Sequence, residues 1–538
     1  MLSSRAIAPR DALLTTSVDG ATRVNTSRLP DLKALVRSPH GRACLLAFLV
    51  VMAVVVKAAW LCDDAFITQR TVDNFLHGRG LTWNPGERVQ AYTHPLWLAV
   101  LVVADFLAPG GYASLMLASL ATTAVAVGLL LKGLPRRAPA VVAAAAALVL
   151  SRAHVDFATS GLENPLAALL LALAVQASLR ADEGAPQADA ARGRRVARLA
   201  LLVSLVALTR LDLVLVAAPV LALQLWRDGR AAGRRLLLAV APLLAWEAFS
   251  LVYYGFLLPN TAYAKLGTGI PAGDLARQGW WYLEAALRHD PGALAVIVAG
   301  LALALWRGDR TRRLWAAGVA LYLAYVVRIG GDFMLGRFLA VPLFVVVALA
   351  ADLVPGARRG WVVAGVLVLG ALVPGGPLLS ATPKPGAWFH GIADERAYYY
   401  ANTGLLPRLR PGFVEHEHVI AGRQARAITE QKGEAFQVFE SIGFFGYYAG
   451  PKLHIIDALA LGDPFLARLP VPTPRDPRSW RIGHFKRALP DGYRETIADG
   501  RNVIADPRLA RLYDDVRLVT TGGLFEPARW RALARLQF

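Results

Sequence analysis

The chain has 538 residues, of which 55% are hydrophobic and 18% charged, and its mean hydropathy is +0.42. Soluble globular proteins are about 45–50% apolar and about 25% charged, and the apolar residues here form long blocks, so the composition favours a polytopic membrane protein. The net charge of +19 does not indicate nucleic acid, because the arginines form short clusters between apolar blocks, as in cytoplasmic loops.

Residues 1–42 carry seven Lys/Arg against three Asp. This excess of basic residues predicts a cytoplasmic N-terminal segment, and no signal-peptide cleavage site follows it. Two cysteines, Cys44 and Cys62, flank the first apolar run. On one helix they would lie about 27 Å apart, so they are not expected to form a disulfide.

The first apolar run, 43–61, is predicted to cross the membrane outward. If basic loops mark the cytoplasmic side, 95–109 and 112–132 cannot both cross, and 95–109 is expected to lie in the interface or re-enter. The block 199–226 holds Arg210 and Asp212, so it is expected to be a hairpin of two short helices, because charges are costly deep in lipid. The total is about eleven spans, with further apolar blocks at about 138–151, 163–180, 235–253, 291–306, 314–328, 338–354 and 361–380.

The loops between these blocks differ in composition. The basic loops fall at alternate gaps and are predicted to be cytoplasmic: 132–137, 180–198, 226–235, 306–313 and 355–360. The other loops mix acids, bases, Asn, Thr, Gly and aromatic residues: 151–164, 208–212, 253–267 and 328–337. The charge pattern therefore places these mixed loops together with residues 61–70 on the outer face.

The composition changes again at about residue 381, where the apolar blocks shrink. HVIAG (418–422), AFQVFE (435–440) and KLHIIDA (452–458) are predicted strands. ERAYYY (395–400) and PFLARL (464–469) are predicted helices, and 469–480 a loop. The expected organisation is a cytoplasmic segment 1–42, a transmembrane domain 43–380 with an outer loop 62–94, and an extracytoplasmic α/β domain 381–538.

Asp63 and Asp64 directly follow the first span. One reading is a solvated, negatively charged helix end. In a cavity, however, adjacent carboxylates repel one another, so one pKa can rise toward that of a useful base, and such a carboxylate can serve as general base for a hydroxyl. The first part of the loop 63–97 has helical spacing, with Phe66, Ile67, Val72 and Phe75 apolar. This spacing predicts an amphipathic helix lying on the membrane that stops at Gly78 and Gly80.

Charged residues of the other outer loops each have two readings. Glu163 either closes a capping box with Ser160 or has a function. Arg210 either pairs with Asp212 or contacts a phosphate or sugar. Lys265 and Arg337 either snorkel to lipid headgroups or neutralise a phosphate anchored in the bilayer.

The motif WRIGHFKRALPDGY (480–493) brings His484, Lys486 and Arg487 close together in sequence. These residues are predicted to form either a solvated basic face or a lid over a phosphate or glycan. The sequence contains no P-loop, no GxGxxG opening a βαβ unit, no HExxH, no zinc spacing and no GxSxG. A nucleotide cofactor is therefore not indicated. An outward-facing enzyme has no nucleotide supply, so its activated substrate is expected to be borne by a lipid.

Six motifs occur in order: DDAFITQRTVDNFLHGRGLTWNPGERVQAYT, DFATSGLEN, LTRLDLVL, YYGFLLPNTAYAK, GGDFMLGRFL and RIGHFKRALP. Together they resemble the polyprenyl-phosphate-dependent arabinofuranosyltransferases of the GT-C superfamily, in particular the mycobacterial terminal β-(1→2)-arabinofuranosyltransferases. The resemblance covers about residues 50–500. The chain lacks an extended carbohydrate-binding tail beyond about residue 500, so acceptor recognition is expected to differ.

The resemblance implies a multi-pass GT-C enzyme of the inner (plasma) membrane whose active site faces the periplasmic side. Its catalytic acid would be Asp64, with Asp63 beside it, and its donor a polyprenyl-phosphate-linked sugar such as decaprenylphosphoryl arabinofuranose. The acceptor would be a cell-envelope glycan. Some members of the superfamily hold a divalent cation, but this sequence offers no dedicated set of metal ligands.

The remaining candidates are given hypothetical roles around Asp64. Arg337, Lys265, Arg210 and His484 would hold the donor phosphate. Sugar contacts or support of the site are expected from Arg70, Glu163, Asn260 and Asp332. The alternative is a non-enzymatic transporter or an assembly factor of the cell envelope or flagellum, which would share the first-loop motif. A transporter should place charges at mid-membrane in repeated, broken helices, whereas here they lie at one face.

Overall fold

The computed structural model describes residues 38–179, 189–266, 268–355, 358–374, 376–380, 388–472 and 480–537. The predicted cytoplasmic segment 1–42 therefore lies almost wholly outside the described residues. The helices of the first half are α2 (Pro39–Ala58), α3 (Asp63–Leu76), α4 (Pro95–Leu107), α5 (Gly111–Gly133), α6 (Ala138–Leu150), α7 (Arg152–Phe157), α8 (Asn164–Leu179), α9 (Asp189–Ala207) and α10 (Val214–Ala232). They are followed by α11 (Arg235–Tyr253), α12 (Asn260–Leu266), α13 (Ala272–His289), α14 (Pro291–Arg307), α15 (Arg310–Arg328), α16 (Arg337–Ala350) and α17 (Arg358–Ala371).

Several of these helices are long and apolar enough to cross a membrane. Within the described residues α2, α5 and α11 meet that test individually, and α13 and α14 meet it only as a pair bent by 109°. Helices α4, α6 and α8 are apolar but shorter; a helix of 13 residues is about 20 Å long, against a hydrocarbon core of about 30 Å. The prediction of a helical membrane protein is confirmed, but the number of about eleven spans is not.

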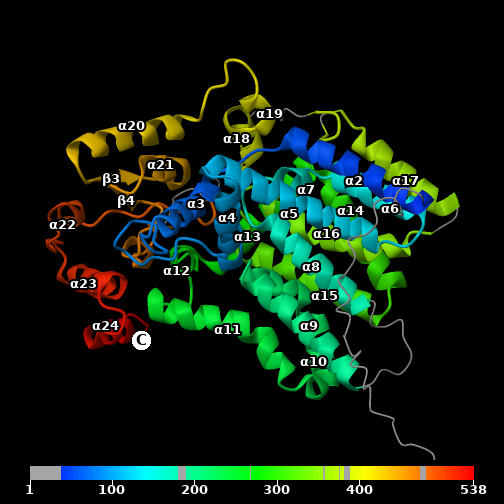
Figure 1. The fold of residues 1–538 in the computed structure, drawn as a ribbon, viewed down its shortest axis with the longest axis horizontal. Helices are drawn as coiled ribbons and strands as arrows, with labels where there is room; N and C mark the ends of the chain where they lie inside the picture. Colours follow the sequence, from blue (N-terminus) through cyan, green and yellow to red (C-terminus); the bar gives the residue numbers. More distant parts are fainter. Residues whose placement is uncertain are drawn as a thin grey trace, which may run out of the picture.

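The helices form a bundle on one side of the molecule, and the C-terminal elements lie on the other (Figure 1). Helix α16 is the centre of the bundle, because every residue from Leu339 to Leu349 is buried. A helix that is apolar on all sides is stable only when neighbours cover it completely. Here α8, α14 and α7 pack around it. Since α16 begins at Arg337, the core of the bundle fixes the position of that arginine.

Helices α4 and α5 have different courses. Both ends of α4 contact α3: His94 Nε2 lies 2.8 Å from the Thr68 hydroxyl, and Gln69 donates to Asp105 at 2.7 Å. Helix α5 instead starts where the Gly111 N–H donates to the Tyr447 hydroxyl and ends near the beginning of α2. Of the two helices, only α5 is long and apolar enough to cross a membrane, and the interfacial or re-entrant course of 95–109 stays a prediction. Cys44 and Cys62 are both free and buried.

The block 199–226 is a helix hairpin, as predicted, with Arg210 and Asp212 at its turn. The two helices are longer than expected, at 19 residues each. Helix α9 begins at Asp189, inside the arginine-rich stretch that the sequence pattern assigned to a loop. The reason is helix propensity, since Ala, Arg and Leu are all strong helix formers.

The C-terminal region contains β1 (Trp388–Phe389), β2 (Ile392–Ala393), α18 (Glu395–Thr403), α19 (Leu405–Arg408), α20 (Glu417–Lys432), β3 (Ala435–Phe439), α21 (Ile442–Ala449), β4 (Leu453–Asp457), α22 (Tyr493–Asp499), α23 (Pro507–Thr521) and α24 (Pro527–Gln537). Strands β3 and β4 pair in parallel and confirm two of the predicted strands, and α18 confirms a predicted helix. The third predicted strand is wrong, because HVIAG lies inside α20. PFLARL forms only the short 3-10 helix η3 (Leu466–Arg468). Most of the predicted loop 469–480 lies outside the described residues.

The C-terminal region is packed closely on the bundle. Arg396 donates to the Ala58 carbonyl at 3.0 Å, and the Tyr400 hydroxyl donates to the Lys57 carbonyl at 2.7 Å, both at the end of α2. The helix predicted for the first part of the loop 63–97 is confirmed as α3, and part of its apolar side is covered by protein. Phe66 packs on Phe444 of α21, with ring centroids 4.7 Å apart. Helix α3 is thus held between the bundle and the C-terminal region.

Candidate active site

The mixed loops of the sequence meet at one end of the bundle, around Glu163. One Glu163 carboxylate oxygen lies 3.3 Å from Arg337 Nη2 and 3.7 Å from Arg210 Nε, and the other lies 3.3 Å from His94 Nδ1. Glu163 itself is 1% exposed. Four loops far apart in sequence therefore converge on one buried charge cluster, as the charge pattern predicted.

Asp63 links the first outer loop to the C-terminal region. Its two carboxylate oxygens accept the backbone N–H groups of Gly443, at 3.0 Å, and Phe444, at 2.8 Å, which begin α21. A side chain at Gly443 would lie 1.8 Å from the Asp63 carbonyl, so only glycine fits there. Burial, together with the repulsion of Asp64, raises the pKa of Asp63 to about 7 despite these hydrogen bonds. The raised pKa predicted for one of the two aspartates therefore belongs to Asp63, whose carboxylate oxygens already accept hydrogen bonds.

Asp64 has the more open carboxylate, with 20% of its side chain exposed. Its Oδ1 lies 3.7 Å from Nε2 of His484, which comes from the C-terminal region. Burial alone would raise the pKa of Asp64, but His484, Arg337 and Lys265 outweigh that effect and lower it below the usual range. Asp64 is therefore an ionised carboxylate facing a group of cations.

These cations are Arg337, Arg210 and Lys265. Arg337 also faces Asp332, at 3.5 Å, and Arg210 pairs with Asp212 and donates to the Tyr322 hydroxyl at 3.1 Å. The Lys265 side chain is exposed and runs alongside Gly483. Among the residues that the structure describes, Arg337 Nε and Arg210 Nη1 are buried without a hydrogen-bond partner. Buried donors are normally paired, so these two N–H groups are available to an anionic ligand.

Glu163 does not form the capping box that was one reading of its motif. The Ser160 hydroxyl accepts the Leu162 N–H at 3.4 Å, and α8 begins one residue after Glu163. The carboxylate turns to Arg337 and Arg210 instead, because two buried guanidinium groups need a counter-charge. One oxygen faces both arginines. The other lies 3.3 Å from His94 Nδ1 but has no hydrogen-bond partner in the described structure, so Glu163 chiefly supports the cation cluster.

Arg70 and Asn260 are not at the site, contrary to their predicted roles. Arg70 donates to the carbonyls of Trp83 and Leu453, at 2.8 and 2.9 Å, and to that of Gly446. Asn260 donates to three carbonyls between Ala460 and Asp463, at 3.0–3.2 Å. Both side chains satisfy buried backbone acceptors. They fix the C-terminal region on the outer loops and do not reach Asp64.

The predicted basic cluster of the last motif is also not formed. Only His484 reaches the site; Lys486 pairs with Glu440 at the surface. Arg487 is buried and donates to the carbonyls of Leu469 and Ala264, at 3.1 and 2.7 Å. His484 is placed by the turn that precedes it, whereas Lys486 and Arg487 are neighbours in an extended segment and therefore point in opposite directions.

The sequence interpretation missed three residues at the site, His94, Glu395 and Arg481. Glu395 is 6% exposed and lies 3.3 Å from Arg481. Burial, with Asp64 and Asp63 nearby, raises the pKa of Glu395 to about 8, although Arg481 opposes this. A glutamate at the start of a helix gives no sequence signal of its own. Arg481 stands in the motif RIGH, for which the sequence indicated only a basic face or a lid.

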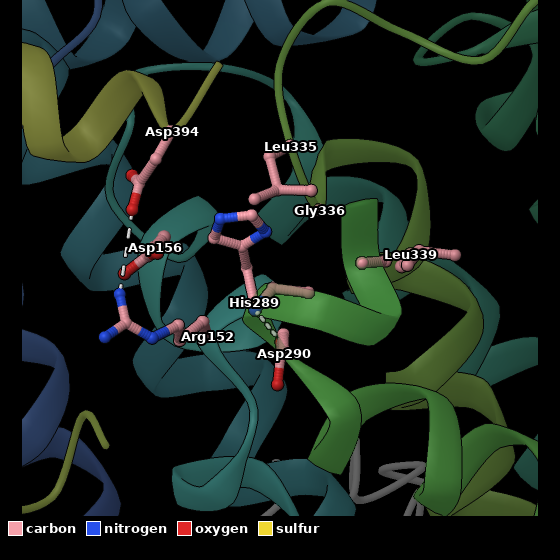
Figure 2. Close-up of a pocket in the computed structure, with 10 residues that line it drawn as sticks. Arg152, Asp156, His289, Asp290, Leu335, Gly336, Leu339 and Asp394 are labelled. Atoms are coloured by element: carbon pink, nitrogen blue, oxygen red, sulfur yellow. Dashed lines mark hydrogen bonds and ion pairs between the residues drawn. The ribbon is translucent and has the colours of Figure 1, made fainter. Parts of the chain in front are cut away.

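A second polar cluster lies beside the site, where α7, the bend between α13 and α14, and α18 meet. Figure 2 shows Arg152 and Asp394 pointing toward one another, with Asp156 beside them and His289 next to Asp290. Arg152 and Asp394 are 3.6 Å apart, and Arg396 lies 3.2 Å from Asp156. The charges of this cluster pair with one another, so we interpret it as the junction that holds α18 on the bundle.

The described part of the chain contains no group of three or more His, Cys, Asp or Glu side chains arranged to hold a metal ion. At the site, Glu163 and Asp332 are paired with arginines and Asp63 with backbone N–H groups. Asp64 is the acidic side chain there with the most open carboxylate.

Asp63→Ala is expected to loosen the start of α21 while leaving donor binding intact. The change removes both acceptors of the Gly443 and Phe444 N–H groups, at a cost of about 1–3 kcal/mol. Hydrogen exchange of 442–449 should therefore be about five- to 150-fold faster, since 1.4 kcal/mol corresponds to a factor of ten. Gly443→Ala should accelerate exchange of the same residues, because its methyl group would push α21 away from Asp63. Unchanged exchange in both variants would contradict the capping role.

Glu163→Gln is expected to destabilise the protein near pH 7, because two buried arginines lose the carboxylate that they share and keep only Asp332 and Asp212. Burial would raise the pKa of Glu163, but Arg337, His94 and Arg210 lower it to about 2, from an ordinary value of 4.5. The stabilisation is therefore complete above about pH 4.5 and lost as the pH falls toward 2. Melting temperatures in detergent should differ between variant and wild type at pH 7 and converge over that window. A constant difference would contradict the ion cluster.

Comparison with known proteins places this geometry in context. No family model matches the chain. A terminal beta-(1->2)-arabinofuranosyltransferase of Corynebacterium glutamicum is 33% identical over 363 residues, which are 58% of this chain and 51% of the relative. The protein of the same name from Mycobacterium tuberculosis is 28% identical over an alignment of 549 residues that covers 82% of both chains. The chain thus spans about half the length of the first relative and most of the second.

The structure is similar to the crystal structure of ArnT from Cupriavidus metallidurans bound to undecaprenyl phosphate. The TM-score is 0.50 at 14% identity, over 78% of this chain and 86% of that chain. At such low identity the likeness shows the fold alone. The resemblance seen in the sequence motifs is therefore confirmed: the chain is homologous to terminal beta-(1->2)-arabinofuranosyltransferases and has an ArnT-like fold.

Proposed function

We propose that the protein is a membrane glycosyltransferase that moves arabinofuranose from a polyprenyl-phosphate donor to a glycan acceptor of the cell envelope. The observation that carries this proposal is the arrangement of Asp64 opposite Arg337, Lys265 and Arg210. A base for a hydroxyl and a pocket for a phosphate then lie side by side, which is what transfer from a sugar phosphate requires. The homologues' shared name supplies the sugar.

The donor phosphate would lie against Arg337 and Lys265. The buried N–H groups of Arg337 and Arg210 that lack partners in the described structure would donate to its oxygens. Charge-assisted bonds from guanidinium to phosphate are among the strongest hydrogen bonds in proteins. They would also stabilise the charge that develops on the phosphate as it leaves, and such electrostatic stabilisation usually contributes most of the rate enhancement.

Asp64 would take the proton of the acceptor hydroxyl. Without ligand, the neighbouring cations hold its pKa low, which makes it a weak base. A bound phosphate would neutralise Arg337 and Lys265 and so raise the pKa of Asp64 toward the useful range. The site would thus gain basicity only once the donor is in place.

The polyprenyl chain would run along α16 into the bundle. The far end of this helix, about 13 Å or more from Arg337, lines an apolar cavity of about 310 Å³ between α6, α14 and α17. Its walls include Val346 and Ala350 of α16, Ala143 of α6, Gly300 of α14 and Val363 of α17. The small residues leave the room that an isoprenoid chain would fill. The active site would then face the periplasmic side of the plasma membrane.

The test is transfer by purified protein in detergent. Decaprenylphosphoryl arabinofuranose would be offered with short arabinose- and galactose-terminated acceptors, and products read by mass spectrometry. Arabinose transfer to one acceptor class supports the proposal and identifies the acceptor. If folded protein transfers another lipid-linked pentose but never arabinose, the sugar is wrong. If no lipid-linked sugar is transferred, the enzyme assignment fails, and a non-enzymatic role in the envelope becomes the better reading.

A further inference from the structure

The imidazole of His484 reaches the site by way of a tight turn. The His484 N–H donates to the Arg481 carbonyl at 2.8 Å, and Gly483 between them has φ +84°. This is the geometry of a turn that needs glycine at its third position. The turn presents the ring to Asp64 and packs it edge-on against Phe333, with ring centroids 4.2 Å apart. Its side chain is only 6% exposed.

The two ring nitrogens have different surroundings. Nε2 faces Asp64 Oδ1 at 3.7 Å, slightly beyond hydrogen-bond distance. Nδ1 is buried and has no hydrogen-bond partner in the described structure. A neutral imidazole has one donor and one acceptor nitrogen, so the buried ring has an unused hydrogen-bonding group. Such a group gains a partner when a ligand enters the site.

The groups around His484 favour a neutral ring. Burial lowers the pKa of His484, Lys265 and Arg481 lower it further, and Asp64 opposes them. A neutral ring adds no positive charge to a phosphate site, which Arg337, Arg210 and Lys265 already supply. It can, however, accept a proton on one nitrogen while it donates from the other.

We propose that His484 is a second catalytic residue, which relays the acceptor's proton from Asp64 to the departing phosphate; this inference rests on the proposed function. The acceptor oxygen forms a bond to the anomeric carbon as the bond from that carbon to the phosphate oxygen breaks, and the electron pair leaves with the phosphate. The hydroxyl proton passes to Asp64 and on to His484 Nε2. Nδ1–H gives its proton to a phosphate oxygen, so Asp64 is ionised again and no net charge is left on the protein. The ring is left protonated on Nε2 and returns to the Nδ1–H tautomer by proton exchange with water after the products leave.

The relay is tested with His484→Asn and His484→Ala, using Lys486→Gln on the same segment as the matched control. Asparagine keeps a donor near the Nδ1 position but cannot relay a proton. We expect kcat to fall about 10²-fold or more in both variants, with the KM for donor within about twofold of wild type. Added imidazole should restore activity to His484→Ala, following the unprotonated fraction of imidazole. Lys486→Gln should behave as wild type.

Three outcomes would overturn the relay. A KM raised about tenfold at unchanged kcat would make His484 a phosphate ligand only. If His484→Ala folds poorly, His484→Asn decides: full kcat in that variant excludes the relay. Lack of imidazole rescue in folded His484→Ala also counts against it. Absence of transfer by wild type would instead overturn the proposed function, and the relay with it.

Discussion

Asp64→Asn is expected to lower kcat for sugar transfer by about 10²–10⁴-fold, the range typical of a lost general base. Asparagine has the same shape as aspartate but cannot hold the acceptor's proton. Donor binding should be unchanged or slightly tighter, because the neutral side chain no longer competes with the phosphate for Arg337 and Lys265. The KM for donor should therefore stay the same or fall. Initial rates over a series of donor concentrations separate the two effects.

The matched control is Asp73→Asn. Asp73 lies on the same helix α3 but away from the site, and its carboxylate pairs with Arg79 at a distance of 2.6 Å. This variant should keep wild-type kinetics, so a loss confined to position 64 cannot come from a weakened α3. If Asp64→Asn retains full kcat, Asp64 is only a charged helix end. Glu395, the other buried carboxyl facing Asp64, would then be the base to test.

Arg337→Gln is expected to raise the KM for donor by about 10²-fold or more, as removal of a buried charged partner costs about 3–5 kcal/mol. Part of that cost falls on the fold, because Glu163 and Asp332 lose their common counter-charge. Arg337→Lys keeps the charge but not the planar fork of donors, so it should show an intermediate KM of about tenfold above wild type. The binding of polyprenyl phosphate, measured by thermal shift, should rank wild type, Arg337→Lys and Arg337→Gln in the same order of affinity, and this measurement does not depend on catalysis.

Arg328→Gln is the control for this series. Arg328 is exposed at the end of α15, close in sequence to the same loop. Its loss should leave the KM unchanged. If Arg337→Gln is folded and binds polyprenyl phosphate as tightly as wild type, the cation cluster stabilises the bundle and does not bind the donor.

The charge pattern was sufficient to predict which loops meet. Basic loops at alternate gaps left the loops of Asp64, Glu163, Arg210, Lys265 and Arg337 for the opposite side, and the structure brings them together. The rule works because basic residues resist transfer across the membrane. It says nothing of helix number, and several apolar blocks form helices too short to count as spans.

The individual roles within those loops depended on tertiary contacts. Arg70 and Asn260 have the residue types of a sugar-binding site, yet both are engaged by backbone carbonyls of other segments, chiefly in the C-terminal region. Asp63 and Asp64 are adjacent and chemically alike. Only the position of α21, some 380 residues later in the chain, decides that Asp63 caps a helix and Asp64 keeps an open carboxylate.

The sequence by itself determined the class of protein, the location of its polar loops and its homology, because hydrophobicity, charge and ordered motifs are properties of the chain alone. The tertiary structure decided which charges pair and which remain for a ligand. A charge that a neighbour neutralises and one that faces an open site look alike in sequence. Burial and distance, which separate Asp63 from Asp64 and Arg70 from Arg337, exist only once the loops are folded together.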